Sequence, residues 1–246
     1  MIRGYFVAGT DTSVGKTEVA RAILFGLARA GLRPRPLKPV ETGCDPERPG
    51  DALALREAAG FEGPLDEVCP YRFTLPAAPL VAAQAASASI SIERIEALVS
   101  RDDRPIVVEA AGGLFVPITR EVSSASLEQA DPPERAPAQT LVTNLDLAER
   151  LGLPVVLVAR AGLGTLNHCA LSAEALARRG IEIAAIVLNR LQAEDDATVP
   201  TNRRLVEEMT GCRVLGPTPY VGDAAARPGA LLPLLISLVD TPLRRR

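Results

Sequence analysis

The segment GTDTSVGKT, residues 9–17, restricts the fold of this chain more than any other stretch. It follows the short apolar run RGYFVAG at 3–9, which is typical of a buried strand, and it precedes a helical pattern at 15–30. In that pattern apolar side chains share one face at spacings of three and four, namely Val19, Ala20, Ile23, Leu24 and Leu27. A strand, a glycine-containing loop and a helix that starts at Gly-Lys-Thr form the setting of a phosphate-binding P-loop.

The spacing inside this segment departs from the usual G-x-x-x-x-G-K-[ST] pattern, because Thr10 stands where the first glycine belongs and Gly9 lies one residue early. Gly15, Lys16 and Thr17 fit the pattern. In such a loop the backbone N–H groups at the helix N-terminus point at the anion, the lysine reaches the outer phosphates and the threonine hydroxyl ligates Mg²⁺. The alternative is a plain strand–helix turn with a solvated lysine. It accounts less well for the joint occurrence of strand, loop, Gly-Lys-Thr and helix.

Apolar runs and helical stretches alternate along the rest of the chain. We expect further strands at 34–40, 104–113, 153–162, 181–191 and 212–220, and helices at 51–60, 76–86, 91–101, 164–179, 200–210 and 229–239. Short apolar strands separated by helices predict a mainly parallel sheet with helices on both faces. We therefore expect a single doubly wound α/β domain of the P-loop NTPase type over residues 1–246. The polar, proline-rich stretch at 119–140 is expected to be a mobile surface loop.

The composition narrows the function classes. The chain has 246 residues, a net charge of −3 and no apolar run of about 18 residues, which argues against nucleic-acid and membrane partners. The N-terminus enters a strand-like run directly, so no secretory signal is expected. A single histidine, His168, argues against a multi-histidine metal site. The cysteines form no C-x-x-C pair and predict reduced thiols in a cytoplasmic protein: Cys44, Cys69, Cys169 and Cys212.

Three charged residues are candidate companions of the P-loop. Glu109 ends a buried run just before Gly-Gly, where a parallel strand opens onto the ligand-binding edge of the sheet, and its carboxylate suits Mg²⁺. Asp51 starts a helix and is either a second magnesium ligand or a plain N-cap. Lys38, within PLKPV, either neutralises charge on a transferred phosphoryl group or is an edge lysine that extends to solvent. The sequence alone leaves both alternatives open.

Two polar segments further along have weaker signals. GLGTLNH at 162–168 is either an anion site at a helix N-terminus, for instance for a carboxylate, or an ordinary helix start capped by Thr165, which we favour. His168 is more typical of a packed side chain than of a catalytic base. Asn189 ends a strand and either offers its amide to a nucleobase or serves as a turn residue.

Taken in order, seven motifs resemble those of the dethiobiotin synthetases: GTDTSVGKT, LKPVETG, GDALAL, CPYRFTLPAAPLVAA, VVEAAGGLFVPI, GLGTLNH and LNR. The resemblance runs from about residue 3 to 220 and is far more specific than the P-loop alone. It implies a ligase of biotin biosynthesis that uses ATP and Mg²⁺ to join 7,8-diaminononanoate and CO₂ into dethiobiotin. In that family one amine takes up CO₂ as a carbamate, the carbamate attacks the γ-phosphate, and the second amine closes the ring with loss of phosphate.

The resemblance also implies roles for individual residues. Lys16 and Lys38 are the implied catalytic residues, flanking the carbamate and the γ-phosphate. The implied magnesium ligands are Thr17, Asp51 and Glu109. The implied contacts to the diamine are Thr12, Thr42, Gly164, Thr165 and Asn167. The implied contacts to the nucleotide are Ser13, Val14, Gly15, Lys16, Thr17, Glu18, Asp51, Glu109, Ala110, Ala111, Gly112, Asn189, Arg190, Thr218, Pro219 and Tyr220. The GLGTLNH loop resembles one that reaches the substrate carboxylate of a neighbouring subunit, which implies a homodimer with sites at the interface.

The chain departs from the family pattern at three places. Ser13 stands where many members have an acidic residue, Ala111 replaces a glycine, and the loop at 119–140 is longer than usual, for which we expect no role. Two other classes share parts of the pattern. A P-loop ATPase switch that positions cargo or partitions DNA typically carries an extra lysine in the loop, which GTDTSVGK lacks. An amide synthase acting on corrinoid side chains usually carries a glutaminase domain, for which the chain has no room.

Overall fold

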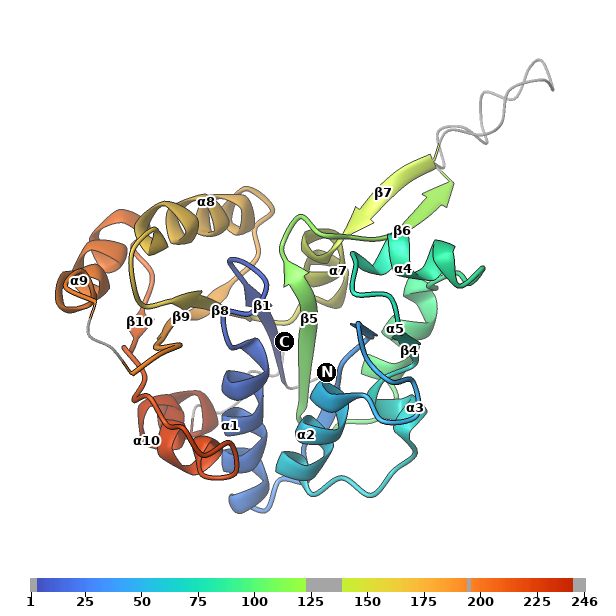
Figure 1. Ribbon diagram of the computed structural model, residues 1–246, viewed down its shortest axis with the longest axis horizontal. Coiled ribbons are helices and arrows are strands. Elements are labelled where there is room, and N and C mark those ends of the chain that lie inside the picture. The colour runs from blue at the N-terminus through green and yellow to red at the C-terminus, as the bar shows by residue number, and fades with distance from the viewer. Residues whose placement is uncertain (1–3, 123–138, 194–195, 241–246) are drawn as a thin grey trace.

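The computed structural model describes residues 4–122, 139–193 and 196–240 of the chain. Within these residues, six parallel strands form the central sheet in the order β10-β9-β8-β1-β5-β2 (Figure 1). They are β1 (Gly4–Gly9), β2 (Arg35–Leu37), β5 (Ile106–Gly113), β8 (Val155–Arg160), β9 (Ile183–Asn189) and β10 (Val214–Leu215). The expected α/β class with a mainly parallel sheet is therefore confirmed.

Helices cover both faces of this sheet, as expected for a doubly wound fold (Figure 1). One face is covered by α1 (Lys16–Arg29), α2 (Gly50–Ala59) and α10 (Arg227–Asp240). The other is covered by α4 (Pro79–Ala85), α5 (Ile92–Val99), α7 (Asn144–Leu151), α8 (Thr165–Arg178) and α9 (Val199–Thr210).

The strand β1 lies in the middle of the sheet, and its side chains alternate between the two apolar clusters. Tyr5 and Val7 pack in the cluster beneath α1, while Phe6 and Ala8 pack in the cluster on the other face. Because both faces are buried, β1 is a continuous apolar run instead of an alternating one. The sheet thus fixes the position at which the chain leaves β1 and enters the P-loop.

The helix α1 packs closely against α10. A Cβ atom built on Gly26 of α1 would lie 2.6 Å from Leu232 Cδ1 and 2.7 Å from Val239 Cγ2, so only glycine allows the two helices to approach this far. At the far end of α10 the hydroxyl of Tyr5 donates to the carbonyl oxygen of Leu238 at 3.0 Å, which ties the helix to the central strand.

The run expected as one strand at 34–40 is two strands. β2 ends at Leu37 alongside β5, whereas β3 (Val40–Thr42) pairs in parallel with β4 (Tyr71–Phe73) in a separate two-stranded sheet. Pro39 lies between them and has no N–H group with which to continue a ladder. The chain therefore leaves the central sheet at Lys38.

The strand expected at 212–220 is also shorter, since β10 covers only Val214–Leu215. Gly216 has a φ of 111°, and Pro217 and Pro219 have no N–H donors, so the ladder cannot continue past Leu215. The helix α3 (Leu65–Val68), the strand β4 and the helix α7 were not anticipated from the sequence.

The loop expected at 119–140 is shorter at both ends. Residues 119–122 belong to β6 (Pro117–Val122) and residues 139–140 belong to β7 (Gln139–Thr143), and these two strands form an antiparallel pair. The remainder of the expected loop, 123–138, lies outside the described residues. Thr143 then caps α7 through a capping box with Asp146.

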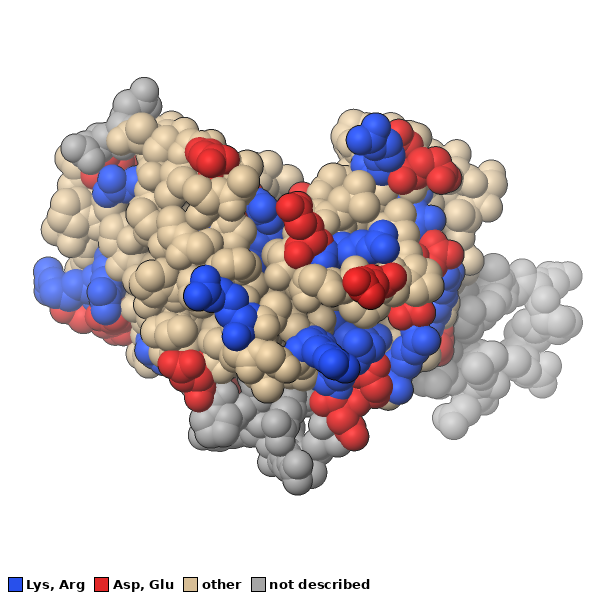
Figure 2. Space-filling model, turned by 90° about the horizontal axis from the view of Figure 1, so that it is seen from below, with Lys and Arg blue, Asp and Glu red and all other residues tan. Residues whose placement is uncertain are grey.

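Acidic and basic side chains are interspersed over the face of the molecule seen in Figure 2, where neither sign gathers over a broad area. The described residues also form local ion pairs, such as Arg104–Asp102 with nitrogen and oxygen 2.8 Å apart. Among the described residues, no helix has the length and apolar character needed to cross a membrane.

Two neighbouring residues of α10 test the packing of this helix. Leu235 is fully buried and Ile236 is 42% exposed. We expect Leu235→Ala to lower the free energy of unfolding by about 2–5 kcal/mol through the cavity it leaves, and Ile236→Ala to lower it by less than about 1 kcal/mol. Chemical denaturation of both variants measures the difference, and equal losses would contradict the described packing of α10.

Candidate active site

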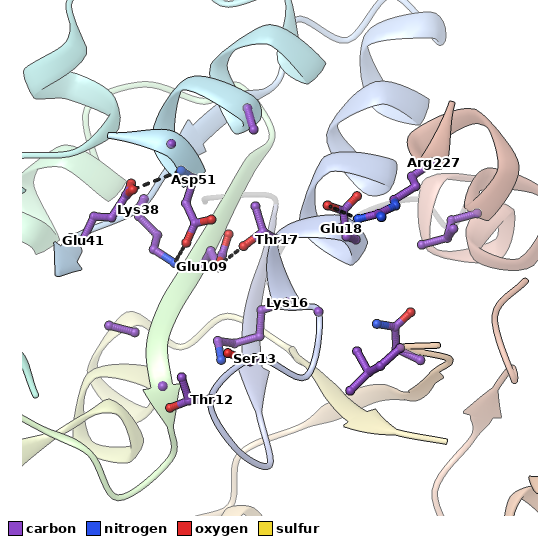
Figure 3. Close-up of a pocket in the computed structure, with 18 of the residues that line it drawn as sticks. Thr12, Ser13, Lys16, Thr17, Glu18, Lys38, Glu41, Asp51, Glu109 and Arg227 are labelled. Atoms are coloured by element: carbon purple, nitrogen blue, oxygen red, sulfur yellow. Dashed lines mark hydrogen bonds and ion pairs between the residues drawn. The ribbon is translucent and has the colours of Figure 1, made fainter. Parts of the chain in front are cut away.

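A cleft of about 610 Å³ opens at the carboxyl ends of the central strands (Figure 3). Its walls come from the β1–α1 loop, the β2–β3 junction, the start of α2, the end of β5, the end of β9 and the segment 219–221. The residues expected from the sequence that line it are Thr12, Ser13, Gly15, Lys16, Thr17, Glu18, Lys38, Thr42, Asp51, Glu109, Ala111, Gly112, Asn189, Arg190, Pro219 and Tyr220.

Six other expected residues do not line this cleft. Val14, Ala110 and Thr218 are almost fully buried behind its wall. Gly164, Thr165 and Asn167 lie at the start of α8, away from the cleft of their own chain. Thr165 is not the cap of α8 that we favoured. Gly164 occupies the N-cap position, and the Thr165 hydroxyl faces the sulfur of Cys169.

The P-loop is held in shape by the end of β9. Gly15 has a φ of 91°, and a Cβ atom at this position would lie 2.0 Å from Asn189 Nδ2. Glycine is therefore required for both the backbone conformation and the contact. Ser13 also has a left-handed φ, 56°, which is uncommon for a residue with a side chain and marks local strain in the loop.

Lys16 turns back over its own loop. Its side chain is buried, and its Nζ donates to the carbonyl oxygen of Asp11 at 3.0 Å. Burial, together with the nearby ammonium group of Lys38, lowers the pKa of Lys16 to about 8. The loop thus holds a lysine whose charge is poorly compensated until an anion arrives.

The floor of the cleft is a cluster of opposite charges (Figure 3). The ammonium group of Lys38 donates to Glu109 Oε1 at 2.6 Å and to Asp51 Oδ2 at 2.9 Å. The Thr17 hydroxyl donates to the same Glu109 oxygen at 2.9 Å. Glu109 pairs in register with Val7 of β1, so the sheet itself places its carboxylate beside the P-loop helix.

Electrostatics favour the ionised forms of Lys38 and Asp51, whereas burial raises the pKa of Glu109 above its ordinary value. Burial alone would lower the pKa of Lys38, but the attraction of Glu109 and Asp51 raises it above its ordinary value. Burial likewise opposes ionisation of Asp51, yet the Lys38 ammonium holds the pKa of that carboxyl below its usual range. Lys38 is therefore charged within the cleft and is not the solvent-extended edge lysine that the sequence left open.

The donor set fits a magnesium ion. Glu109 Oε2 is buried and has no hydrogen-bond partner, while Thr17 and Asp51 supply further oxygen atoms close by. Mg²⁺ prefers oxygen ligands and usually takes one or two carboxylates together with phosphates and water. No group of three or more His, Cys, Asp or Glu side chains suited to a metal occurs in the described ranges, so phosphate oxygens and water would have to complete the shell.

The other end of the cleft is organised by Asn189. Its Nδ2 donates to the carbonyl oxygen of Val14 at 3.0 Å, and its Oδ1 accepts from the Thr218 hydroxyl at 2.7 Å. The backbone N–H of Arg190 donates to the same Thr218 hydroxyl at 2.9 Å. Asn189 therefore joins the P-loop to the segment that contains Pro219.

Two charged residues of the cleft lining were missed by the sequence analysis, Glu41 and Arg227. Arg227 pairs with Glu18 of α1 at 3.3 Å and donates to the carbonyl oxygen of Val221, so it fixes the segment before α10 over the cleft. Arg227 belongs to none of the motifs recognised in the sequence, so no pattern pointed to it. Glu41 left no local signal either, because Asp51 itself offered a plausible cap for the helix that follows, and only the structure shows Glu41 in that role.

Comparisons with known proteins identify the family of the chain. A family model described as an AAA domain matches residues 3–130 and 135–227. The chain is 44% identical over 243 residues to a protein of Anaeromyxobacter dehalogenans (strain 2CP-C) named ATP-dependent dethiobiotin synthetase BioD, covering 97% of this chain and 100% of the relative. The chain belongs to the dethiobiotin synthetase family. A protein of the same name from Thermodesulfovibrio yellowstonii is 35% identical over 232 residues, 91% of each chain.

A solved structure of the MinC:MinD cell division protein complex of Aquifex aeolicus contains a chain with a similar fold. The TM-score is 0.52 over 99% of both chains, but the identity is only 12%, so the likeness shows the fold alone. The family expected from the sequence is thus confirmed, and the ATPase-switch alternative is not favoured over a dethiobiotin synthetase.

The lowered pKa of Lys16 predicts that nucleotide binding depends on pH. With a pKa of about 8, Lys16 of the free protein loses its proton as the pH rises above that value, whereas bound phosphate favours the charged form. ATP affinity should then fall roughly tenfold per pH unit above about pH 8, with proton uptake on binding. Calorimetry in buffers of different ionisation enthalpy measures both effects. Lys16→Arg is the control, and a wild-type affinity as insensitive to pH as that variant's would contradict the assignment.

Proposed function

We propose that this enzyme closes the ring of 7,8-diaminononanoate with CO₂ and ATP, giving dethiobiotin, ADP and phosphate in biotin biosynthesis. The observation that carries the proposal is the convergence of the P-loop lysine, Lys38, Asp51 and Glu109 in one cleft. The relatives named ATP-dependent dethiobiotin synthetase match nearly the whole chain, which supports the use of ATP and of a small-molecule substrate.

The first half of the reaction uses the two lysines. One amine of the diamine attacks CO₂ and loses a proton, which gives a carbamate. A carbamate oxygen then attacks the γ-phosphorus, and ADP leaves. Lys16 and Lys38 lie on either side of the P-loop threonine, where their ammonium groups would offset the negative charge of the carbamate and the phosphoryl group.

The second half needs no nucleophile from the protein. The free amine attacks the carbonyl carbon of the carbamic–phosphoric anhydride, phosphate leaves, and the loss of a proton completes the cyclic urea. Thr12 and Thr42 also line the cleft and are the proposed contacts to the diamine. Water must be kept from the anhydride, since hydrolysis would waste ATP.

Thr17, Asp51 and Glu109 would hold Mg²⁺. Bound there, the ion would offset the negative charge of the phosphates during transfer. The Lys38 ammonium contacts both carboxylates and offsets part of their negative charge. Ser13 to Glu18, Ala110 to Gly112, and the Asn189 and Tyr220 ends of the cleft are the proposed contacts to the nucleotide.

We also infer a homodimer in which each cleft is completed by the neighbouring subunit. Gly164 and Asn167 are exposed but lie outside their own cleft, so their proposed contact with the substrate carboxylate requires a second chain, whereas Thr165 is fully buried. Leu163 and Leu171 are exposed apolar residues close to this loop in sequence. Phe115 is an exposed apolar residue at the same edge of the sheet. They follow β5 and β8, the two strands that flank β1. An apolar surface at that edge suits a partner chain.

We place the enzyme in the cytoplasm, where ATP is available. The cysteines of the described ranges are all free thiols, as is usual for proteins of a reducing compartment.

The proposed reaction is tested by phosphate release from Mg·ATP and bicarbonate, with and without 7,8-diaminononanoate, and by mass measurement of the product. Diamine-dependent release with dethiobiotin as product is expected. Lys38→Met should lower turnover at least about a hundredfold while ATP still binds, because an ammonium group at the transferred phosphoryl is lost. Phosphate release that does not depend on the diamine but is stimulated by DNA or membranes would instead support an ATPase switch.

The shared site predicts complementation between two inactive variants. Lys38→Met removes a group from one wall of the cleft, and Asn167→Ala removes one from the loop of the other subunit. Co-expressed, the two should form mixed dimers with one intact site, giving about a quarter of wild-type turnover. Turnover no higher than that of the variants alone would show that each chain forms its site unaided.

A further inference from the structure

The N-terminus of α2 is capped by a residue from outside the helix. Pro49 occupies its N-cap position and offers no side-chain acceptor. Glu41 of β3 takes this role with both carboxylate oxygens. Oε1 accepts from the backbone N–H of Asp51 at 3.0 Å, and Oε2 accepts from that of Ala52 at 2.9 Å (Figure 3). A carboxylate at this end also interacts favourably with the helix dipole.

The cap determines where the Asp51 side chain points. An aspartate in the first turn of a helix often bonds to the helix amides itself. Here Glu41 occupies those amides, and the Asp51 carboxylate turns to the Lys38 ammonium 2.9 Å away. The side chain of Asp51 is 43% exposed, so little packing holds it in place apart from its backbone and its hydrogen bonds with Lys38 and Thr17.

Glu41 itself is held firmly. Only 6% of the residue is exposed, and its strand pairs in register with Arg72 of β4. Both carboxylate oxygens already accept backbone N–H groups, which leaves the side chain poorly suited to bind an ammonium group of the substrate. The geometry therefore favours a supporting role over direct contact, although the next residue, Thr42, faces the cleft.

We propose that Glu41 is a positioning residue that holds the first turn of α2, and through it Asp51, in the orientation that magnesium binding requires. The inference rests on the magnesium role proposed for Asp51. It adds a partner that neither a P-loop pattern nor the family names assign. Residues that support metal ligands from outside the coordination shell commonly change metal affinity roughly 10- to 100-fold when they are replaced.

Glu41→Gln is the variant of choice, because it keeps the shape but leaves one oxygen to accept and turns an N–H₂ group toward the second amide. Glu57→Gln, on the exposed side of α2, is the matched control, and Asp51→Asn is the reference for loss of the ligand. Two readouts need no turnover: hydrogen exchange at Asp51 and Ala52 in the metal-free protein, and the Mg²⁺ titration of a complex with a non-hydrolysable ATP analogue.

We expect Glu41→Gln to speed exchange at the two amides and to weaken Mg²⁺ binding roughly tenfold, with kcat at saturating Mg²⁺ and the KM for the diamine within about twofold of wild type. Glu57→Gln should change neither readout. Faster exchange with unchanged Mg²⁺ affinity would show a cap without a positioning role. A change confined to the KM of the diamine would show a substrate contact. Either result overturns the proposal.

A variant with a different cap separates the effect of capping α2 from the effect of the negative charge of Glu41. Serine at position 49 can accept from the same two amides, so Pro49→Ser combined with Glu41→Gln should restore most of the lost Mg²⁺ affinity. The double variant also supports the helix if Glu41→Gln alone fails to fold. If the two amides of the double variant are protected but its Mg²⁺ affinity stays as low as that of Asp51→Asn, the proposal is overturned. If Asp51→Asn binds Mg²⁺ like wild type, the ligand assignment fails first, and the inference fails with it.

Discussion

The contact on which the site depends is the buried ammonium group of Lys38 between the carboxylates of Glu109 and Asp51. A charge removed from water is tolerated only when partners compensate it, and here the partners come from β5 and from the start of α2. Thr17 of α1 adds a hydroxyl to the same oxygen of Glu109. Elements that are distant in sequence are thereby fixed at one point, at the floor of the cleft.

The parallel sheet makes this convergence possible. Strands that run in one direction deliver all their carboxyl ends to the same edge, where the loops that follow can share a ligand. β1 ends there in the P-loop, β5 brings Glu109, and β9 brings Asn189. Helices on both faces bury the strands, so each of them is a short apolar run that can be recognised in the sequence.

This is why much of the fold could be predicted from residue patterns, and why Glu109 could be found before any geometry was known. An acid at the end of a buried run must have a partner or a ligand. The division of 34–40 into two strands was missed because only the pairing partners, β5 and β4, reveal it. Glu41 and Arg227 were missed because they act through backbone groups and ion pairs that local sequence does not encode. Thr165 was misjudged since glycine can start a helix without a side-chain acceptor.

The position of Asn189 has a consequence for how a base could be read. A carboxamide has two N–H donors and two acceptor lone pairs on its oxygen. One donor is engaged by Val14 and one lone pair by Thr218, and both engagements stiffen the loop that Gly15 closes. One donor and one lone pair of the amide therefore stay available. Adenine and guanine both present an adjacent donor and acceptor that could pair with such an amide, so Asn189 by itself would not select the base, and any selection would have to come from the rest of this end of the cleft, where Pro219 and Tyr220 lie.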